Sequence, residues 1–193
     1  MKNIVIVISG GGSNLAALLR AAREQDWAGR HDARVAAVVS NRPEAGGLRL
    51  AREAGVPTAV IDHQAFASRE AFDMALAEEV DRHAPVLVLL AGFMRVLTPG
   101  FVRRYTGRLL NIHPSLLPAF SGLHTHQRAL DAGCRFAGAT VHQVTEVLDD
   151  GAILDQVVVP VFAGDTADSL AARVLTQEHV MYPRVVARLL SEL

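Results

Sequence analysis

The sequence contains very little cysteine and few aromatic residues. Cys134 carries the one thiol among the 193 residues, and Phe, Trp and Tyr together make up 5% of the chain. A single cysteine excludes a disulfide framework and fits a reducing compartment. We therefore expect a cytoplasmic protein in which Cys134 packs or faces solvent and is not a catalytic nucleophile.

The sequence also has no long apolar run and no excess of charge of one sign. Its longest apolar stretch, residues 86–94, is far shorter than the roughly 20 residues of a membrane-spanning helix. The apolar N-terminal residues are too few for a signal peptide before glycines follow. The formal net charge is −1 and no basic tract is present. We expect no membrane segment and no nucleic-acid partner.

The length and the 50% hydrophobic content favour a single domain, residues 1–193, with a sizeable core. In the first part of the chain, strand-like and helix-like segments alternate. Strands are predicted at 4–8, 34–39, 58–61, 86–91 and 109–112. Helices are predicted at 15–25 and 47–55, after Ser68 as N-cap, and after Thr98 as N-cap with Pro99 following. This alternation predicts a parallel sheet with helices on both faces.

The pattern changes in the last part of the chain. Two strand-like segments, 138–144 and 153–161, are separated by a short loop, which favours an antiparallel pair. Residues 166–193 are helical in character, and we expect an interruption near Pro183. The predicted class is α/β, a Rossmann-like, mostly parallel sheet with flanking helices and antiparallel strands in the C-terminal part.

The stretch "SGGGSN", residues 9–14, joins the first strand to the first helix. Exposed N–H groups at a helix start, together with the helix dipole, favour an anion such as phosphate. A dinucleotide site is a weaker interpretation, because Leu15 occupies the third glycine position and the second strand ends without an acidic residue. No Gly-Lys-Ser/Thr follows, so a P-loop is excluded. A tight turn without a ligand is the remaining alternative.

The stretch "LLNIHPSLLPAFSGLHTH", residues 109–126, holds three of the eight histidines. His124 and His126 lack the four-residue spacing of helical metal pairs and have no third ligand nearby, so we predict no metal. Asn111 and His113 are two apart at a strand end and so point the same way. An amide donor beside an imidazole can stabilise an oxyanion while protons move. The alternative is a strand end whose polar groups are simply satisfied.

A carboxylate near this imidazole would favour its charged form and fix its tautomer. Asp149 and Asp150 lie in "VLDDGA", the loop between the two late strands. Taken alone, "DDG" is also a turn signal.

Several of these motifs occur together, in the same order, in one known family. The chain resembles the folate-dependent glycinamide ribonucleotide formyltransferases of purine synthesis over nearly its whole length. The matching segments are "IVIVISGGGSNL", "VVSNRPEAGGLRLAREAGV", "LAGFMRVLTPGFV", "LLNIHPSLLPAFSGLHTH", "GATVHQVTEVLDDGAIL" and "RVLTQEHVMYP". The resemblance implies two small-molecule substrates, glycinamide ribonucleotide and the formyl donor 10-formyltetrahydrofolate, in a monomer or homodimer.

The resemblance also implies roles for individual residues. The catalytic set would be Asn111, His113 and Asp149. The contacts to the ribonucleotide would be Gly12, Ser13, Asn14, Arg69 and Glu178. The folate pocket would be lined by Phe93, Met94, Arg95, Val96, Leu97 and Val144, together with Asn111 and Asp149. Residues from 1 to about 100 would form the phosphate-binding half, and residues from about 101 to 193 the folate-binding and catalytic half.

The chain departs from the family pattern in three loops. Gly11 replaces the asparagine of the usual "SGNGSN", Ser121-Gly122 stands where relatives often have "PG", and "DDG" replaces "DGG". None of these changes removes a member of the catalytic set. His124, His126 and His142 receive no catalytic role, although His142 could support the site from a neighbouring strand.

Three alternative functions share some of these features. A formyltetrahydrofolate hydrolase would use the same three residues but usually has an added N-terminal domain. A methionyl-tRNA formyltransferase normally needs an added C-terminal domain and a basic surface. A nucleotide-binding regulatory module would explain "SGGGSN" but would not require Asn111, His113 and Asp149 together.

Overall fold

The protein is built around one seven-stranded sheet, seen in a computed structural model of residues 1–193. The strand order is β3-β2-β1-β4-β5-β6-β7. The five strands from β3 to β5 are parallel, and β6 is antiparallel to both β5 and β7. The strands are β1 (Lys2–Ile8), β2 (Ala33–Ser40), β3 (Thr58–Val60), β4 (Pro85–Leu90), β5 (Leu109–His113), β6 (Phe136–Gln143) and β7 (Ile153–Pro160). The predicted fold class is confirmed.

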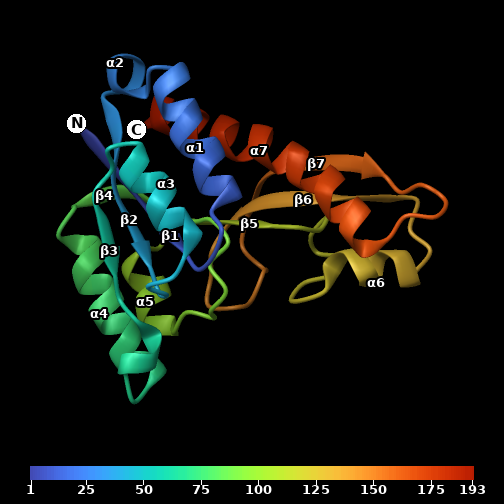
Figure 1. The fold of residues 1–193 in the computed structure, drawn as a ribbon, viewed down its shortest axis with the longest axis horizontal. Helices are drawn as coiled ribbons and strands as arrows, with labels where there is room; N and C mark the ends of the chain where they lie inside the picture. The colour runs from blue at the N-terminus through green and yellow to red at the C-terminus, as the bar shows by residue number, and fades with distance from the viewer.

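Helices cover both faces of this sheet (Figure 1). One face packs against α1, α3 and α7, and the other packs against α4 and α5. The helices are α1 (Ser13–Glu24), α2 (Trp27–His31), α3 (Gly46–Glu53), α4 (Arg69–Asp81), α5 (Pro99–Arg104), α6 (Thr125–Asp131) and α7 (Ala167–Glu192), with a short 3₁₀ turn at His63–Ala65. The predicted N-caps Ser68 and Thr98 both accept a hydrogen bond from the third residue of their helix. No helix combines the length and the apolar character needed to span a membrane.

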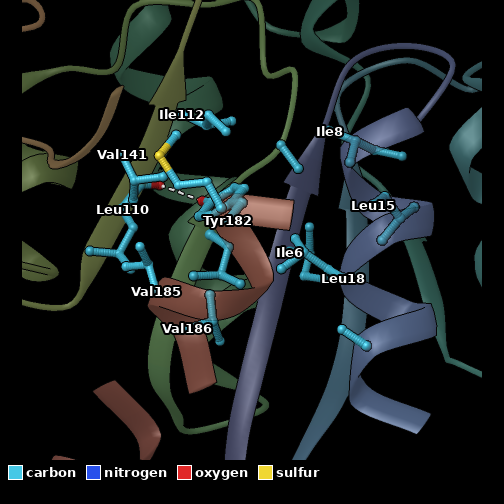
Figure 2. Packing of buried hydrophobic residues seen from close by; sticks show 14 of the residues in the cluster. Ile6, Ile8, Leu15, Leu18, Leu110, Ile112, Val141, Tyr182, Val185 and Val186 are labelled. Atoms are coloured by element: carbon cyan, nitrogen blue, oxygen red, sulfur yellow. Dashed lines mark hydrogen bonds between the residues drawn. The ribbon is translucent and has the colours of Figure 1, made fainter. Parts of the chain in front are cut away.

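The alternation of side chains along β1 divides the core into two clusters. Ile4, Ile6 and Ile8 face α1, α3 and α7, whereas Val5 and Val7 face α4 and α5. All five are fully buried, which is expected for a central parallel strand. Figure 2 shows the larger cluster, in which side chains of α1 and α7 meet those of β1, β5 and β6.

The predicted interruption near Pro183 is wrong, because α7 runs unbroken from Ala167 to Glu192 with Pro183 inside it. Proline costs the helix one hydrogen bond. The same turn buries Met181, Tyr182, Val185 and Val186, and this packing outweighs the lost bond. The hydroxyl of Tyr182 also donates to the carbonyls of Leu90 and Leu110, at 3.1 and 3.3 Å, which ties α7 to β4 and β5 (Figure 2).

The strand order reverses direction between β1 and β4, so their carboxyl ends form the switch point of the sheet. Ligands of open α/β sheets bind at such a point. Ser9 follows β1 and Gly92 follows β4, and the Ser9 N–H donates to the Gly92 carbonyl at 3.2 Å. The same Ser9 accepts at its Oγ from the Met94 N–H at 2.8 Å. The glycine loop and the segment after β4 are thus held side by side.

Candidate active site

The centre of the site is a group of three polar side chains, Asn111, His113 and His142, at the ends of β5 and β6. Leu110 and Ile112 of β5 point into the larger core cluster, so Asn111 and His113 point to the opposite face. The antiparallel register places His142 of β6 directly opposite Asn111. His113 and His142 are both buried, with 7% and 2% of their surface exposed.

Asp149 reaches this group from the loop between β6 and β7. The loop closes tightly, since a Cβ on Gly151 would lie 1.6 Å from the Gln143 carbonyl oxygen, which excludes any other residue there. Asp149 has a φ of 54°, a left-handed conformation that Asp tolerates better than most residues. Its Oδ2 lies 3.4 Å from Nδ1 of His113 and accepts from the Gly122 N–H at 2.9 Å. Three of the predicted residues therefore come together.

Both ring nitrogens of His113 face oxygen atoms of the protein. Its Nε2 lies 3.1 Å from the carbonyl oxygen of Phe120, which can only accept a hydrogen bond. Its Nδ1 faces the Asp149 carboxylate, which when ionised also only accepts. A hydrogen on each ring nitrogen would satisfy both partners.

The contacts of His142 favour the neutral form of that ring. Its Nδ1 lies 2.9 Å from the Gln143 carbonyl oxygen and so carries the hydrogen. Its Nε2 is then free to accept from the Asn111 amide, at 3.3 Å. Burial lowers the pKa of His142, in agreement with a neutral ring. His142 also lies 3.8 Å from Asp149 and so contacts two of the three predicted catalytic residues.

His142 was expected at most to support the site from a neighbouring strand, and the structure places it in direct contact with two of the three predicted catalytic residues. The signal that points to it is the register of β5 and β6, which is set by pairing and cannot be read from spacing along the chain. His124 and His126 take no part in these hydrogen bonds. His124 is the exposed N-cap of α6 with a φ of 56°, and burial lowers the pKa of His126.

The segment between β5 and α6 is fixed by Thr140 of β6. The Oγ1 of Thr140 accepts from the Leu117 N–H at 3.0 Å and donates to the Ser115 carbonyl at 2.7 Å. The Leu117–Pro118 peptide bond in this segment is cis. These contacts place the carbonyl of Phe120 against His113, and they position the Gly122 N–H that binds Asp149.

The glycine loop lies at the start of α1, with Gly10, Gly11 and Ser13 exposed. Gly12 has a φ of 80°, and a Cβ there would lie 2.8 Å from the Cα of Gly47. A side chain is therefore excluded at this position by both conformation and space. The Gly47 N–H donates to the Gly10 carbonyl at 3.1 Å, so the start of α3 supports the loop.

Asn14 differs from its neighbours because its side chain turns inward. Its amide donates to the Oε2 of Glu178 on α7 at 2.7 Å. Glu178 is buried, and burial raises the pKa of its carboxyl above the usual range. The Asn14 hydrogen bond and the charge of His113 oppose this rise. Two residues that were predicted to bind the ribonucleotide therefore contact each other directly.

The predicted folate residues lie in two loops with exposed apolar side chains. Phe93, Leu97 and Val144 pack against the smaller core cluster, whereas Met94 and Val96 are 67% and 52% exposed. The guanidinium of Arg95 lies over the ring of Phe72, 5.2 Å from its centre. Val147 and Leu148, in the second loop, are also exposed. Both loops therefore present apolar side chains that are open to a ligand.

The structure does not join Arg69 to the other predicted residues. Arg69 begins α4, is exposed, and forms no hydrogen bond or ion pair with another predicted residue. No group of three His, Cys, Asp or Glu side chains is arranged to hold a metal ion.

Comparisons with known proteins find one family throughout. The family model described as "Formyl transferase" matches residues 2–186. The phosphoribosylglycinamide formyltransferase of Escherichia coli is 52% identical over 185 residues, which cover 96% of this chain and 85% of that protein. The trifunctional purine biosynthetic protein adenosine-3 of Drosophila melanogaster is 47% identical over 98% of this chain, which spans 14% of that longer protein.

Solved structures agree with these relatives. The phosphoribosylglycinamide formyltransferase of Brucella melitensis is 52% identical with a TM-score of 0.90, over 98% of this chain and 95% of that one. The glycinamide ribonucleotide transformylase 1 of Symbiobacterium toebii is 45% identical with a TM-score of 0.94, over 100% of this chain and 89% of that one.

Proposed function

The chain belongs to the formyl transferase family, and on this premise we propose that it transfers a formyl group from 10-formyltetrahydrofolate to the amino group of glycinamide ribonucleotide. The products would be formylglycinamide ribonucleotide and tetrahydrofolate, in a step of purine biosynthesis. The observation that carries the proposal is the contact of His113 with Asp149, beside Asn111, at the carboxyl end of β5. The proposed setting is the cytoplasm, with a monomer or homodimer as the active form.

Asn111 and His113 are the proposed donors to the oxyanion. The Asn111 amide has two N–H groups, and His142 accepts only one of them. The second can donate to the formyl oxygen as it gains charge. In the structure the Nε2–H of His113 donates to the Phe120 carbonyl oxygen. During the reaction the formyl oxygen would take the place of that carbonyl oxygen as the acceptor. Losing one such donor typically costs about 2.7–4 kcal/mol of transition-state stabilisation.

Asp149 has two proposed tasks in the same step. It stabilises the charged form of His113, and it accepts the proton that the amine loses, directly or through water. The new C–N bond forms between the amine and the formyl carbon. The bond from that carbon to the folate nitrogen then breaks as this nitrogen takes up a proton. No covalent bond to the protein is required.

Substrate positioning is the other proposed contribution of the chain. The backbone N–H groups of Gly12 and Ser13 at the start of α1 suit the phosphate, and Glu178 suits the ribose hydroxyls. Arg69 and the backbone N–H of Asn14 complete the proposed acceptor contacts. The folate would lie against the segment from Phe93 to Leu97 and against Val144. Holding two reactants in place can remove up to about 7–11 kcal/mol of the barrier.

Folate absorbance tests this proposal directly. Purified protein is mixed with 10-formyltetrahydrofolate, with and without glycinamide ribonucleotide. Release of tetrahydrofolate only when the ribonucleotide is present is expected. Equal release in both tubes would instead indicate a hydrolase, and no release in either would refute the formyl-transfer proposal.

Replacing His113 by Ala tests the observation that carries the proposal. We expect kcat to fall by about 10²–10⁴-fold, because both donor and charge are lost. His124→Asn is the matched control, since Asn tolerates the left-handed conformation of this exposed N-cap. Wild-type activity of His113→Ala would refute the role of His113.

A further inference from the structure

Asn14 is buried, whereas Gly10, Gly11 and Ser13 of the glycine loop are exposed. The residue is 8% exposed, whereas Ser13 beside it is exposed. The Asn14 amide nitrogen donates to Glu178, which lies 164 residues further along the chain. The Asn14 Oδ1 atom is buried and has no partner. A side chain in this position is directed toward α7 and away from the exposed N–H groups of the loop.

Glu178 depends on Asn14 for its one hydrogen bond within the protein. Its Oε2 accepts from Asn14, and its Oε1 accepts from no protein group. A carboxylate has about four lone-pair sites, so acceptor capacity remains for a ligand. A buried carboxylate with a single donor is costly unless a ligand supplies others.

We propose that Asn14 is a positioning residue of the sugar-binding subsite, which fixes the carboxylate of Glu178 relative to the glycine loop. The inference rests on the proposed function, in which Glu178 binds the sugar hydroxyls and the loop binds the phosphate. One hydrogen bond then sets the distance between the two anchoring groups. The ligand class is a pentose phosphate with free hydroxyls, and Asn14 acts on hydroxyl recognition through Glu178.

A direct phosphate contact by the Asn14 side chain is the competing role. The loop already offers backbone N–H groups for an anion. The competing role predicts that a change at Asn14 weakens the binding of every phosphorylated ligand equally. The positioning role predicts a loss only for ligands that carry the sugar hydroxyls. Specificity of this kind is the difference between two affinities, so two ligands must be compared.

The test measures binding of glycinamide ribonucleotide and of its analogue without the two ribose hydroxyls, by calorimetry. The variants are Asn14→Asp, Glu178→Gln, and the double variant that combines both changes. Asn14→Asp keeps the shape but places two carboxylates face to face. The double variant restores one donor to the pair, because the amide introduced by Glu178→Gln can donate to the carboxylate introduced by Asn14→Asp. Asn41→Asp, the same change at another buried asparagine with an unpartnered Oδ1, is the control.

We expect Asn14→Asp to weaken binding of the ribonucleotide about 10- to 100-fold and to leave the affinity for the analogue nearly unchanged. The double variant should recover at least part of this loss, and Asn41→Asp should keep the wild-type ratio of affinities. An equal loss for both ligands, or a double variant no better than Asn14→Asp, would overturn the proposal. If Asn14→Asp does not fold, the affinities of Asn14→Ala for the same two ligands are compared. A loss for the ribonucleotide alone supports the proposal, and an equal loss for both ligands overturns it.

Binding is measured instead of turnover so that failure of the Asn14 proposal can be told apart from failure of the proposed function. A protein that binds the ribonucleotide but releases no tetrahydrofolate contradicts the proposed function and still reports the role of Asn14. A wild-type protein that binds both ligands equally contradicts the hydroxyl-binding role of Glu178, and the Asn14 proposal falls with it. The KM for the folate, measured on each variant, should stay within about twofold of wild type, because a general loss of structure would raise it.

Discussion

His142 contacts both Asn111 and Asp149 but is not one of the three proposed catalytic residues. As a neutral ring it accepts from the Asn111 amide and so fixes the direction of the remaining N–H. His142→Leu removes this acceptor, whereas His142→Gln places an amide oxygen in a similar position. We expect kcat to fall about 10- to 100-fold in the first variant, with partial recovery in the second, because a misdirected donor costs rate more than binding.

Steady-state kinetics on both variants provide the measurement, with His83→Gln as a control at a site remote from the reaction. His83 pairs with Glu79 on α4 and touches no proposed site residue. A His142→Leu variant that raises KM and leaves kcat intact would contradict the role of His142 in directing Asn111.

Glu178 gives a second prediction at the residue scale, in the pH dependence of stability. Burial raises the pKa of its carboxyl, while a Glu in the unfolded chain has a pKa of about 4.3. The native state thus holds this proton to a higher pH than the unfolded state. The stability contributed by the group is present below the unfolded pKa and is lost as pH rises through the folded pKa.

Glu178→Gln removes this loss, since Gln stays neutral and its oxygen can still accept from Asn14. We expect the variant to be more stable than wild type at pH 8, with a difference that shrinks as the pH falls toward about 4. Urea unfolding over a pH series measures it. Equal stability at pH 8 would mean that burial of the charge costs nothing.

The longest helix, α7, depends on a hydroxyl that links it to two strands. Tyr182 is fully buried, and burial raises the pKa of its hydroxyl, which therefore stays a donor to the carbonyls of Leu90 and Leu110. Tyr182→Phe would leave both carbonyls without this donor. We expect a loss of about 1–2 kcal/mol in the free energy of unfolding, seen as a lower urea midpoint with an unchanged slope. A midpoint equal to that of wild type would show that this link is not stabilising.

The elements show where sequence reasoning succeeds and where it stops. All seven strands were predicted to within about two residues, because runs such as Ile4 to Ile8 can only be doubly buried. The interruption at Pro183 was not found, since local propensity does not include the packing of Tyr182. Helix α2 was not predicted either. It has only five residues, and its N-cap is Asp26, whose side chain accepts from the Gly29 N–H.

The same distinction applies to the site. The spacing of Asn111 and His113 predicted that both side chains point to the same face, and in β5 they do. Asp149 was one of two adjacent carboxylates, and only the fold brings one of them to His113. The bond from Asn14 to Glu178 joins residues at opposite ends of the chain. No local pattern encodes such a contact, because it arises from the packing of α1 against α7.

At the scale of the whole molecule, the sheet ends in β7, which has an open edge. Side chains of α7 cover part of this edge. Arg188 donates to the Leu154 carbonyl at 2.9 Å and Arg173 to the Pro160 carbonyl at 2.8 Å. Arg184 pairs with Asp155, whose Oδ1 accepts from the Gln156 N–H. Charged side chains at an edge strand oppose pairing with another chain.

We therefore expect the double variant Arg184→Ala, Arg188→Ala to self-associate more strongly than wild type. Removing these side chains frees the Leu154 carbonyl and leaves exposed Val158 and Ile153 on an unprotected edge. Sedimentation velocity over a concentration series measures the change. Arg49→Ala, Arg82→Ala removes the same number of charges from exposed ion pairs on α3 and beside α4, and it should sediment as wild type does. If both double variants associate equally, net charge is the cause, and the β7 edge needs no protection from the arginines of α7.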